Sequence, residues 1–127
     1  MAYPAELKYT KEHEWIKIEG NTGTIGITDH AQNSLGDIVF VELPKVGSDI
    51  TAGKSFGTVE SVKAVSDLYA PMSGKIAEVN PELANAPEKV NSEPHSAWMV
   101  KVTLTNPAEA SALLSAADYE KFVAEEQ

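Results

Sequence analysis

Few of the side chains that usually carry enzymatic chemistry occur in this sequence of 127 residues. It has no cysteine, which excludes disulfides, thiolate metal sites and a cysteine nucleophile. Its three histidines, His13, His30 and His95, lack the mutual spacing of metal ligands, so we interpret each as structural or exposed. It has no nucleophile elbow, phosphate loop or dinucleotide fingerprint, and nineteen Asp and Glu residues make chance carboxylate pairs unavoidable. The sequence therefore indicates no metal site and no self-sufficient enzyme.

One lysine stands out because two strand-like stretches meet beside it. Within the segment from Ser55 to Gly74, Lys63 lies near the meeting point, with Val62 and Val65 on either side. This pattern predicts a hairpin that carries Lys63 at its tip, clear of the sheet. An exposed lysine at a turn is ordinary when taken alone. In a chain without cysteine, however, redox chemistry would have to come from a group attached to the chain.

The charge of the chain limits its partners. Ten lysines, no arginine and nineteen acidic residues give a formal net charge of −9, which argues against nucleic acid because phosphate binding needs clustered positive charge. No stretch approaches the ~20 apolar residues of a membrane span, and the first residues resemble neither a signal peptide nor a transit peptide. We expect a soluble, acidic protein with neither a membrane nor a nucleic-acid partner.

The elements that must position this lysine read mainly as short strands. We predict strands at 14–19, 24–27 and 97–104, and a short helix over 28–36 that begins at a Thr28 cap and ends at Gly36. The segment 37–43 is almost continuously apolar, which predicts a strand buried on both faces or central in a sheet. Frequent Pro and Gly favour a small antiparallel sandwich or barrel over βαβ units.

The last part of the chain has a helical composition. Asn106-Pro107 with Glu109 predicts a capped helix start, and the segment 115–118 repeats the signal more weakly. Residues 80–93 should form a long surface connection with about one helical turn. We therefore expect one domain over 1–127, with a β sandwich over about 8–104 and a helical segment over 106–126. Its apolar stripe toward the sheets would consist of Leu113, Leu114, Tyr119, Phe122 and Val123.

The run Glu60-Ser61-Val62-Lys63-Ala64, followed by Ser66-Asp67, resembles the lipoyl-attachment segment of the glycine cleavage system H protein family, in its bacterial type. Further motifs match this family in the same order over nearly the whole chain: residues 8–15, 26–32, 36–44, 70–74 and 90–94, and Trp98. The chain departs from the family pattern just before Trp98, where Pro94-His95-Ser96-Ala97 replaces a longer, glycine-rich turn.

The resemblance implies a fold and a cofactor. The fold would be mainly β, a flattened barrel-sandwich hybrid like that of lipoyl domains, with two antiparallel sheets, short helices and a helical C-terminus. Lipoate, joined to the Lys63 amine as N6-lipoyllysine, would supply the disulfide that a chain without cysteine lacks. The protein would be a monomeric, non-catalytic shuttle, cytoplasmic in a bacterium or in the mitochondrial matrix if it is a processed eukaryotic form.

The resemblance also implies partners. A pyridoxal-phosphate-dependent glycine decarboxylase (P protein) would load an aminomethyl group onto the arm, and a tetrahydrofolate-dependent aminomethyltransferase (T protein) would remove it. Dihydrolipoamide dehydrogenase (L protein) would then reoxidise the arm. Lipoylating enzymes would recognise the residues that flank Lys63, namely Glu60, Ser61, Val62 and Ala64.

Family resemblance further implies a cleft in which carboxylates meet the cationic amine of the loaded arm. Glu14 and Asp67 match those carboxylates, Glu12 is a third contact, and Ser34 stands where some relatives carry histidine. On residue type alone, both Glu14 and Asp67 could equally be solvated carboxylates.

Other functions stay open from the sequence. A biotinyl carrier would usually have methionine on both sides of the modified lysine, where this chain has Val62 and Ala64. The lipoyl domains of 2-oxoacid dehydrogenases are shorter and lack the entry at residues 11–15 and the helical tail. A relay that passes lipoate to other proteins would look the same in sequence. An unmodified interaction module is the remaining alternative.

Overall fold

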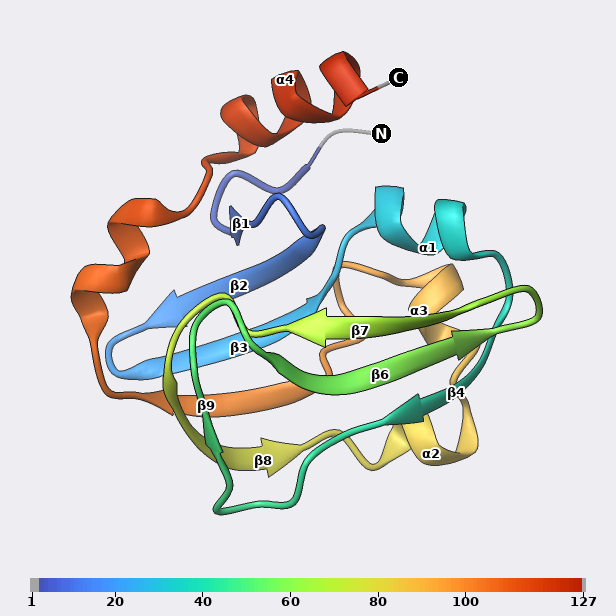
Figure 1. The fold of residues 1–127 in the computed structure, drawn as a ribbon, viewed down its shortest axis with the longest axis horizontal. Coiled ribbons are helices and arrows are strands. Elements are labelled where there is room, and N and C mark those ends of the chain that lie inside the picture. Colours follow the sequence, from blue (N-terminus) through green and yellow to red (C-terminus); the bar gives the residue numbers. More distant parts are fainter. Residues whose placement is uncertain (1–2, 127) are drawn as a thin grey trace.

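The structure, a computed structural model, describes residues 3–126. Two antiparallel sheets lie face to face, a six-stranded sheet in the order β1-β2-β3-β9-β8-β5 and a three-stranded sheet in the order β4-β6-β7 (Figure 1). The strands are β1 (Lys8–Tyr9), β2 (Glu14–Glu19), β3 (Thr22–Ile27), β4 (Ile38–Glu42), β5 (Asp49–Ile50), β6 (Ser55–Ser61), β7 (Val65–Tyr69), β8 (Gly74–Val79) and β9 (Val100–Leu104). The helices are α1 (Asp29–Leu35), α2 (Glu82–Asn85), α3 (Lys89–Ser92), the 3₁₀ helix η1 (Pro107–Ala112) and α4 (Ala116–Glu126). This arrangement is an open sandwich and not a closed barrel, and it confirms the predicted fold class.

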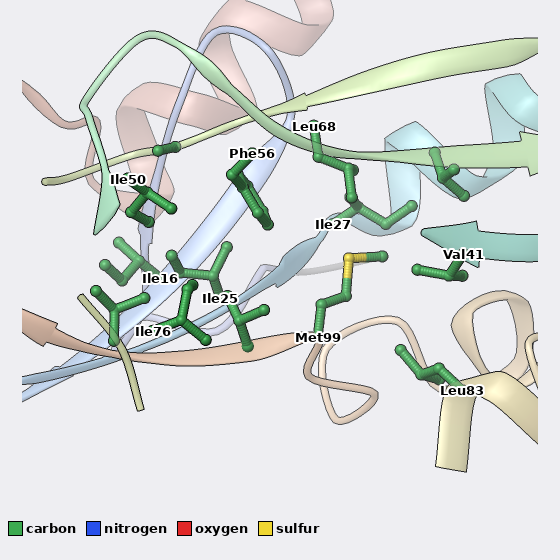
Figure 2. Packing of buried hydrophobic residues seen from close by; sticks show 14 of the residues in the cluster. Ile16, Ile25, Ile27, Val41, Ile50, Phe56, Leu68, Ile76, Leu83 and Met99 are labelled. Carbon is green, nitrogen blue, oxygen red and sulfur yellow. The ribbon is translucent and has the colours of Figure 1, made fainter. Parts of the chain in front are cut away.

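The main hydrophobic core fills the space between the two sheets (Figure 2). Ile16 and Ile25 face inward from the large sheet, and Val59 and Leu68 face them from the small sheet, all at most 1% exposed. Because side chains alternate between the two faces of a strand, this burial fixes which residues of β6 and β7 point outward. No helix within residues 3–126 is both long enough and apolar enough to cross a membrane.

A second apolar cluster attaches the C-terminal helix to the large sheet. Tyr119 of α4 is fully buried and stacks on Tyr9 of β1, with ring centroids 4.8 Å apart. Val123 is also buried there, together with Leu7 and Trp15. The predicted apolar stripe of the tail is thus confirmed for Tyr119 and Val123, and the cluster brings α4 close to the loop before β2.

The helix predicted over 28–36 forms as α1, with both predicted ends. Thr28 Oγ1 accepts a hydrogen bond from the Ala31 amide at 3.2 Å, which satisfies one of the free donors of the first turn. Gly36 ends the helix with a φ of +82°, a conformation that favours glycine. α1 therefore ends directly before the segment on which the lysine hairpin rests.

The prediction that residues 37–43 are buried on both faces, or central in a sheet, is wrong. β4 is an edge strand of the small sheet, and Val39 and Phe40 are 49% and 53% exposed. The pairing with β6 shifts register between Ile38 and Phe40. Such a β-bulge sets two residues of one strand against a single residue of its partner and breaks the regular alternation of faces. An apolar run with a bulge cannot be distinguished by composition from a buried strand.

The helix start predicted at Asn106 is also wrong in its details. Asn106 makes no side-chain cap, η1 is a 3₁₀ helix, and the Glu109 carboxylate instead accepts hydrogen bonds from the amide and hydroxyl of Ser73. The weaker signal is the real one, since Ser115 Oγ accepts from the Asp118 amide at the start of α4.

Two further expectations about the second half of the chain need correction. The connection over 80–93 contains two short helices, α2 and α3, and Leu83 and Val90 anchor them in the core at 1% and 0% exposed. The strand expected from residue 97 begins only at Val100, as β9.

Candidate functional site

The predicted hairpin forms from β6 and β7, and Lys63 lies in the exposed turn at its tip (Figure 1). The Ser61 amide donates to the Ala64 carbonyl at 2.8 Å, which closes the turn. Ser61 Oγ accepts from the amides of Lys63 at 3.2 Å and of Ala64 at 3.1 Å. The Ser61 side chain is buried, so its role is to hold the turn. The backbone beneath Lys63 is thereby fixed while its amine extends outward.

The tip also rests on the segment between α1 and β4. The Val62 amide donates to the Asp37 carbonyl at 3.0 Å. A Cβ placed on Gly36 would lie 3.5 Å from Lys63 Cε, so the stem of the lysine passes beside this glycine. The base of a group carried on Lys63 is therefore directed toward the C-terminal end of α1.

Asn91 of α3 holds this supporting segment together, and sequence reasoning missed it. Its Oδ1 accepts from the Ile38 amide at 2.8 Å. Its Nδ2 donates to Gln32 Oε1 at 2.9 Å and to the Gly36 carbonyl at 2.8 Å. One side chain thus joins α1, β4 and α3 across more than 50 residues of sequence. The only sequence signal was an asparagine within a matching family motif.

A cavity of about 200 Å³ opens between α1, β7 and the loop before β2. It brings together Glu12 and Ser34, two of the predicted arm contacts. The complete lining consists of Glu12, His13, His30, Ala31, Ser34, Leu35 and Ser66. Since Leu35 directly precedes the glycine beside Lys63, this cavity lies along α1 from the lysine stem.

Two histidines contribute to this cavity, which sequence reasoning did not predict. The rings of His13 and His30 lie 4.5 Å apart between centroids. His13 has a φ of +71°, unusual for a residue other than glycine, and its Nδ1 lies 2.7 Å from the Tyr119 hydroxyl of α4. The C-terminal helix therefore helps to shape the cavity wall. Within residues 3–126, no three His, Asp or Glu side chains are grouped so as to hold a metal ion.

Glu14 lies in the wall of a second, mainly apolar cavity of about 320 Å³. Its side chain is 2% exposed, so Glu14 is not a solvated carboxylate. Its carboxylate accepts from Thr10 Oγ1 at 2.7 Å and from the Tyr69 amide of β7 at 3.2 Å. Burial raises the pKa of Glu14 to about 8, although these hydrogen bonds act in the opposite direction. Glu12 lines both cavities and lies between them.

Asp67 has a different environment from Glu14. It is exposed on β7, where it accepts from Ser55 Oγ at 3.3 Å, and it pairs in register with Thr58. It is not among the residues that line either cavity. The structure thus brings Glu12 together with Ser34 and with Glu14, but leaves Asp67 outside both groups.

The buried Glu14 should make folding stability depend on pH. An ordinary glutamate loses its proton near pH 4.5, whereas the raised pKa keeps Glu14 protonated in the folded state up to about pH 8. Between these values the folded state binds the extra proton. The free energy of unfolding should therefore fall as pH rises, by at most ~1.4 kcal/mol per pH unit. Denaturant unfolding from about pH 5 to about pH 8 measures this slope.

The matched control is Glu14→Gln, whose amide has the same shape and does not titrate. Its oxygen can accept from the Tyr69 amide while its nitrogen donates to Thr10 Oγ1, so packing should persist. All other titrations are shared between the two proteins, so the difference between their curves isolates Glu14. Equal slopes in both proteins would show that Glu14 is already ionised in this pH range.

Comparison with known proteins identifies related chains over the full length. The family profile described as Glycine cleavage H-protein matches residues 7–126. The glycine cleavage system H protein of Koribacter versatilis is 74% identical over 126 residues, 99% of this chain and 98% of the relative. That of Carboxydothermus hydrogenoformans is 62% identical, covering 97% of this chain and 95% of the relative. A crystal structure of a glycine cleavage system H protein from Mycobacterium marinum matches with a TM-score of 0.86 at 43% identity, covering 94% of this chain and 97% of that one.

The comparisons agree with the geometry of the hairpin. Members of this family carry lipoate on a lysine, and the hairpin offers an exposed amine on a fixed turn, next to a cavity that could shelter an attached arm. The resemblance found in the sequence motifs is thereby confirmed over residues 7–126. The chain belongs to the glycine cleavage system H proteins, the lipoyl-bearing shuttles of that system.

Proposed function

We propose that Lys63 is the lysine that carries the lipoyl group. The observation that supports this most directly is the position of Lys63 at the tip of the β6–β7 hairpin, on a turn held by three hydrogen bonds to Ser61. An acylating enzyme needs an accessible amine on a defined backbone, and this turn provides both. The flexible stem of lysine then gives the attached arm its reach.

The bound lipoyl group supplies the disulfide chemistry that a chain without cysteine lacks. The chain itself contributes position and shelter. Its glycine at the end of α1 leaves room for the lysine stem, and the cavity lined by Glu12 and Ser34 lies along α1 from that point. Glu12 and Glu14 provide carboxylates that favour a cationic amine on the cargo. Glu14 would ionise when such a cation arrives, because an adjacent positive charge lowers a raised carboxyl pKa.

The other components of the glycine cleavage system are the partners that family membership implies. More specifically, the chain would receive an aminomethyl group from glycine decarboxylase, deliver it to aminomethyltransferase and be reoxidised by dihydrolipoamide dehydrogenase. It would act as a carrier without catalytic activity of its own. The relatives reported above are bacterial, which supports a cytoplasmic location.

Intact-mass analysis of the protein from its native host, followed by peptide mapping, tests the assignment. One lipoyl group should be present, on the peptide that contains Lys63, and the formal net charge should change from −9 to −10 with loss of the lysine charge. Lipoylation at Lys54 or Lys75 with Lys63 free would contradict the proposal. A fully unmodified native protein would instead favour an interaction module.

A further inference from the structure

Exposed apolar side chains gather around Lys63. Among the described residues, five large hydrophobic side chains are exposed, and Val46 is the one located elsewhere. The other four, which we name the hairpin patch, come from the β4 bulge and from the two sides of the hairpin turn. They are Val39, Phe40, Val62 and Val65, with exposed fractions of 49%, 53%, 68% and 67%. An acidic, well-packed domain rarely leaves such side chains together on its surface unless a partner covers them.

Strand register places part of this patch in one row across the small sheet. Glu60 of β6 pairs with Phe40 of β4 on one side and with Val65 of β7 on the other. Directly paired residues point to the same face of a sheet. The adjacent pair Val41 and Val59 is buried in the core, so the row of Phe40, Glu60 and Val65 faces away from it. The hairpin patch is therefore part of the outer face of the β4-β6-β7 sheet.

A second row on the same face is acidic. Two positions farther from the hairpin tip, Thr58 pairs with Glu42 on β4 and with Asp67 on β7. Side chains two residues apart along a strand lie on the same face. Glu42 and Asp67 are both exposed, and Glu60 lies between the apolar members of the first row. Beginning at Lys63, the outer face is thus apolar around the root of the lysine and negatively charged behind it.

We propose that this outer face docks the enzyme that loads the arm, and that the hairpin patch closes around the arm's root. The inference rests on the proposed function, because it takes Lys63 as the attachment point. The partner surface would have an apolar rim at the mouth of a channel deep enough to admit the arm, with Lys or Arg beyond the rim to face Glu42 and Asp67. Apolar contact around the root excludes water from the channel, and the charges orient the approach.

The apolar part of the proposal is tested with lipoylated Phe40→Ser and Val65→Ser carriers and glycine decarboxylase from the same organism. The rate of glycine decarboxylation, measured against carrier concentration, should give a KM about tenfold higher for Phe40→Ser, with kcat within about twofold. Val65→Ser should shift KM in the same direction. Val46→Ser is the matched control, since Val46 is 64% exposed but lies outside the patch, and its KM should be unchanged.

The charged part has its own pair of variants. Glu42→Lys should raise KM at low ionic strength, and the increase should shrink as added salt screens the charges. Glu78→Lys places the same charge change on an exposed residue of β8 in the other sheet. It should affect KM much less. An equal increase for both variants would reduce the effect to overall net charge and overturn the role of the acidic row.

The remaining outcomes decide between occupants of the face. An unchanged KM for both Phe40→Ser and Val65→Ser would overturn the proposal. A loss of lipoylation in these variants, with normal KM for the molecules that are modified, would assign the patch to the attaching enzyme instead. A wild-type dimer in analytical ultracentrifugation that becomes monomeric in Phe40→Ser would assign it to a second copy. Peptide mapping of the lipoylated protein keeps these outcomes separate from failure of the Lys63 assignment itself.

Discussion

A protein with arginine in place of Lys63 should fold normally, accept no lipoyl group and support no glycine cleavage. The side chain is exposed in a turn whose hydrogen bonds come from the backbone and from Ser61, so its replacement removes no buried contact. A guanidinium keeps its proton and its charge at any pH that proteins tolerate, so it cannot form the amide that an amine forms. Glycine-dependent release of carbon dioxide should fall to the level measured without carrier. Intact mass should equal that of the unmodified chain.

Lys54→Arg and Lys75→Arg are matched controls, because both lysines are exposed and flank the strands of the hairpin region. Both variants should be lipoylated and active. Circular dichroism and thermal unfolding of Lys63→Arg should match the unsubstituted protein, which excludes misfolding as the cause of inactivity. Retained lipoylation in Lys63→Arg would mean that another lysine is the attachment site and that the hairpin has another purpose.

Carriers loaded with the aminomethyl group should lose it faster when Glu14 becomes Gln. A charge-assisted hydrogen bond to the cationic amine contributes roughly 1.5–3 kcal/mol, so the unprotected fraction should rise by about one to two decades. Asp67→Asn should have a smaller effect, because Asp67 is exposed and lies outside both cavities. The measurement is the spontaneous hydrolysis rate of isolated, loaded protein. Loading by the decarboxylase should change little, since the incoming oxidised dithiolane carries no charge for these groups to recognise.

The pH dependence of this protection separates the two carboxylates. Glu14 must ionise to hold the cation, and burial has raised its pKa to about 8, so acid conditions oppose docking. The ratio of hydrolysis rates, Glu14→Gln over wild type, should therefore increase as pH rises toward 8, and Asp67→Asn should lack this trend. The ratio cancels the pH dependence of the hydrolysis chemistry itself. Equal rates in wild type and Glu14→Gln at every pH would show that the arm is sheltered without Glu14.

Much of the lysine site could be predicted because its signals are local. The turn at Lys63 depends on Ser61, two residues away, and the end of α1 depends on the positive φ of Gly36. Caps and turns of this kind are determined by side chains that bond the backbone within three or four residues. Sequence motifs in the right order then identified the family, as the comparisons confirmed over residues 7–126.

The sequence by itself determined the strand-rich composition, the hairpin with its exposed lysine, the helix before Gly36 and the family. Only the tertiary structure decided burial and neighbourhood. Glu14 became a buried carboxylate because β7 donates the Tyr69 amide to it from 55 residues away. The bulge in β4 turned an apolar run outward, and Asn91 joined three elements around the lysine's support. The physical reason is the same in each case: burial, pKa and strand register depend on groups that only folding brings into contact, so no local pattern of residues encodes them.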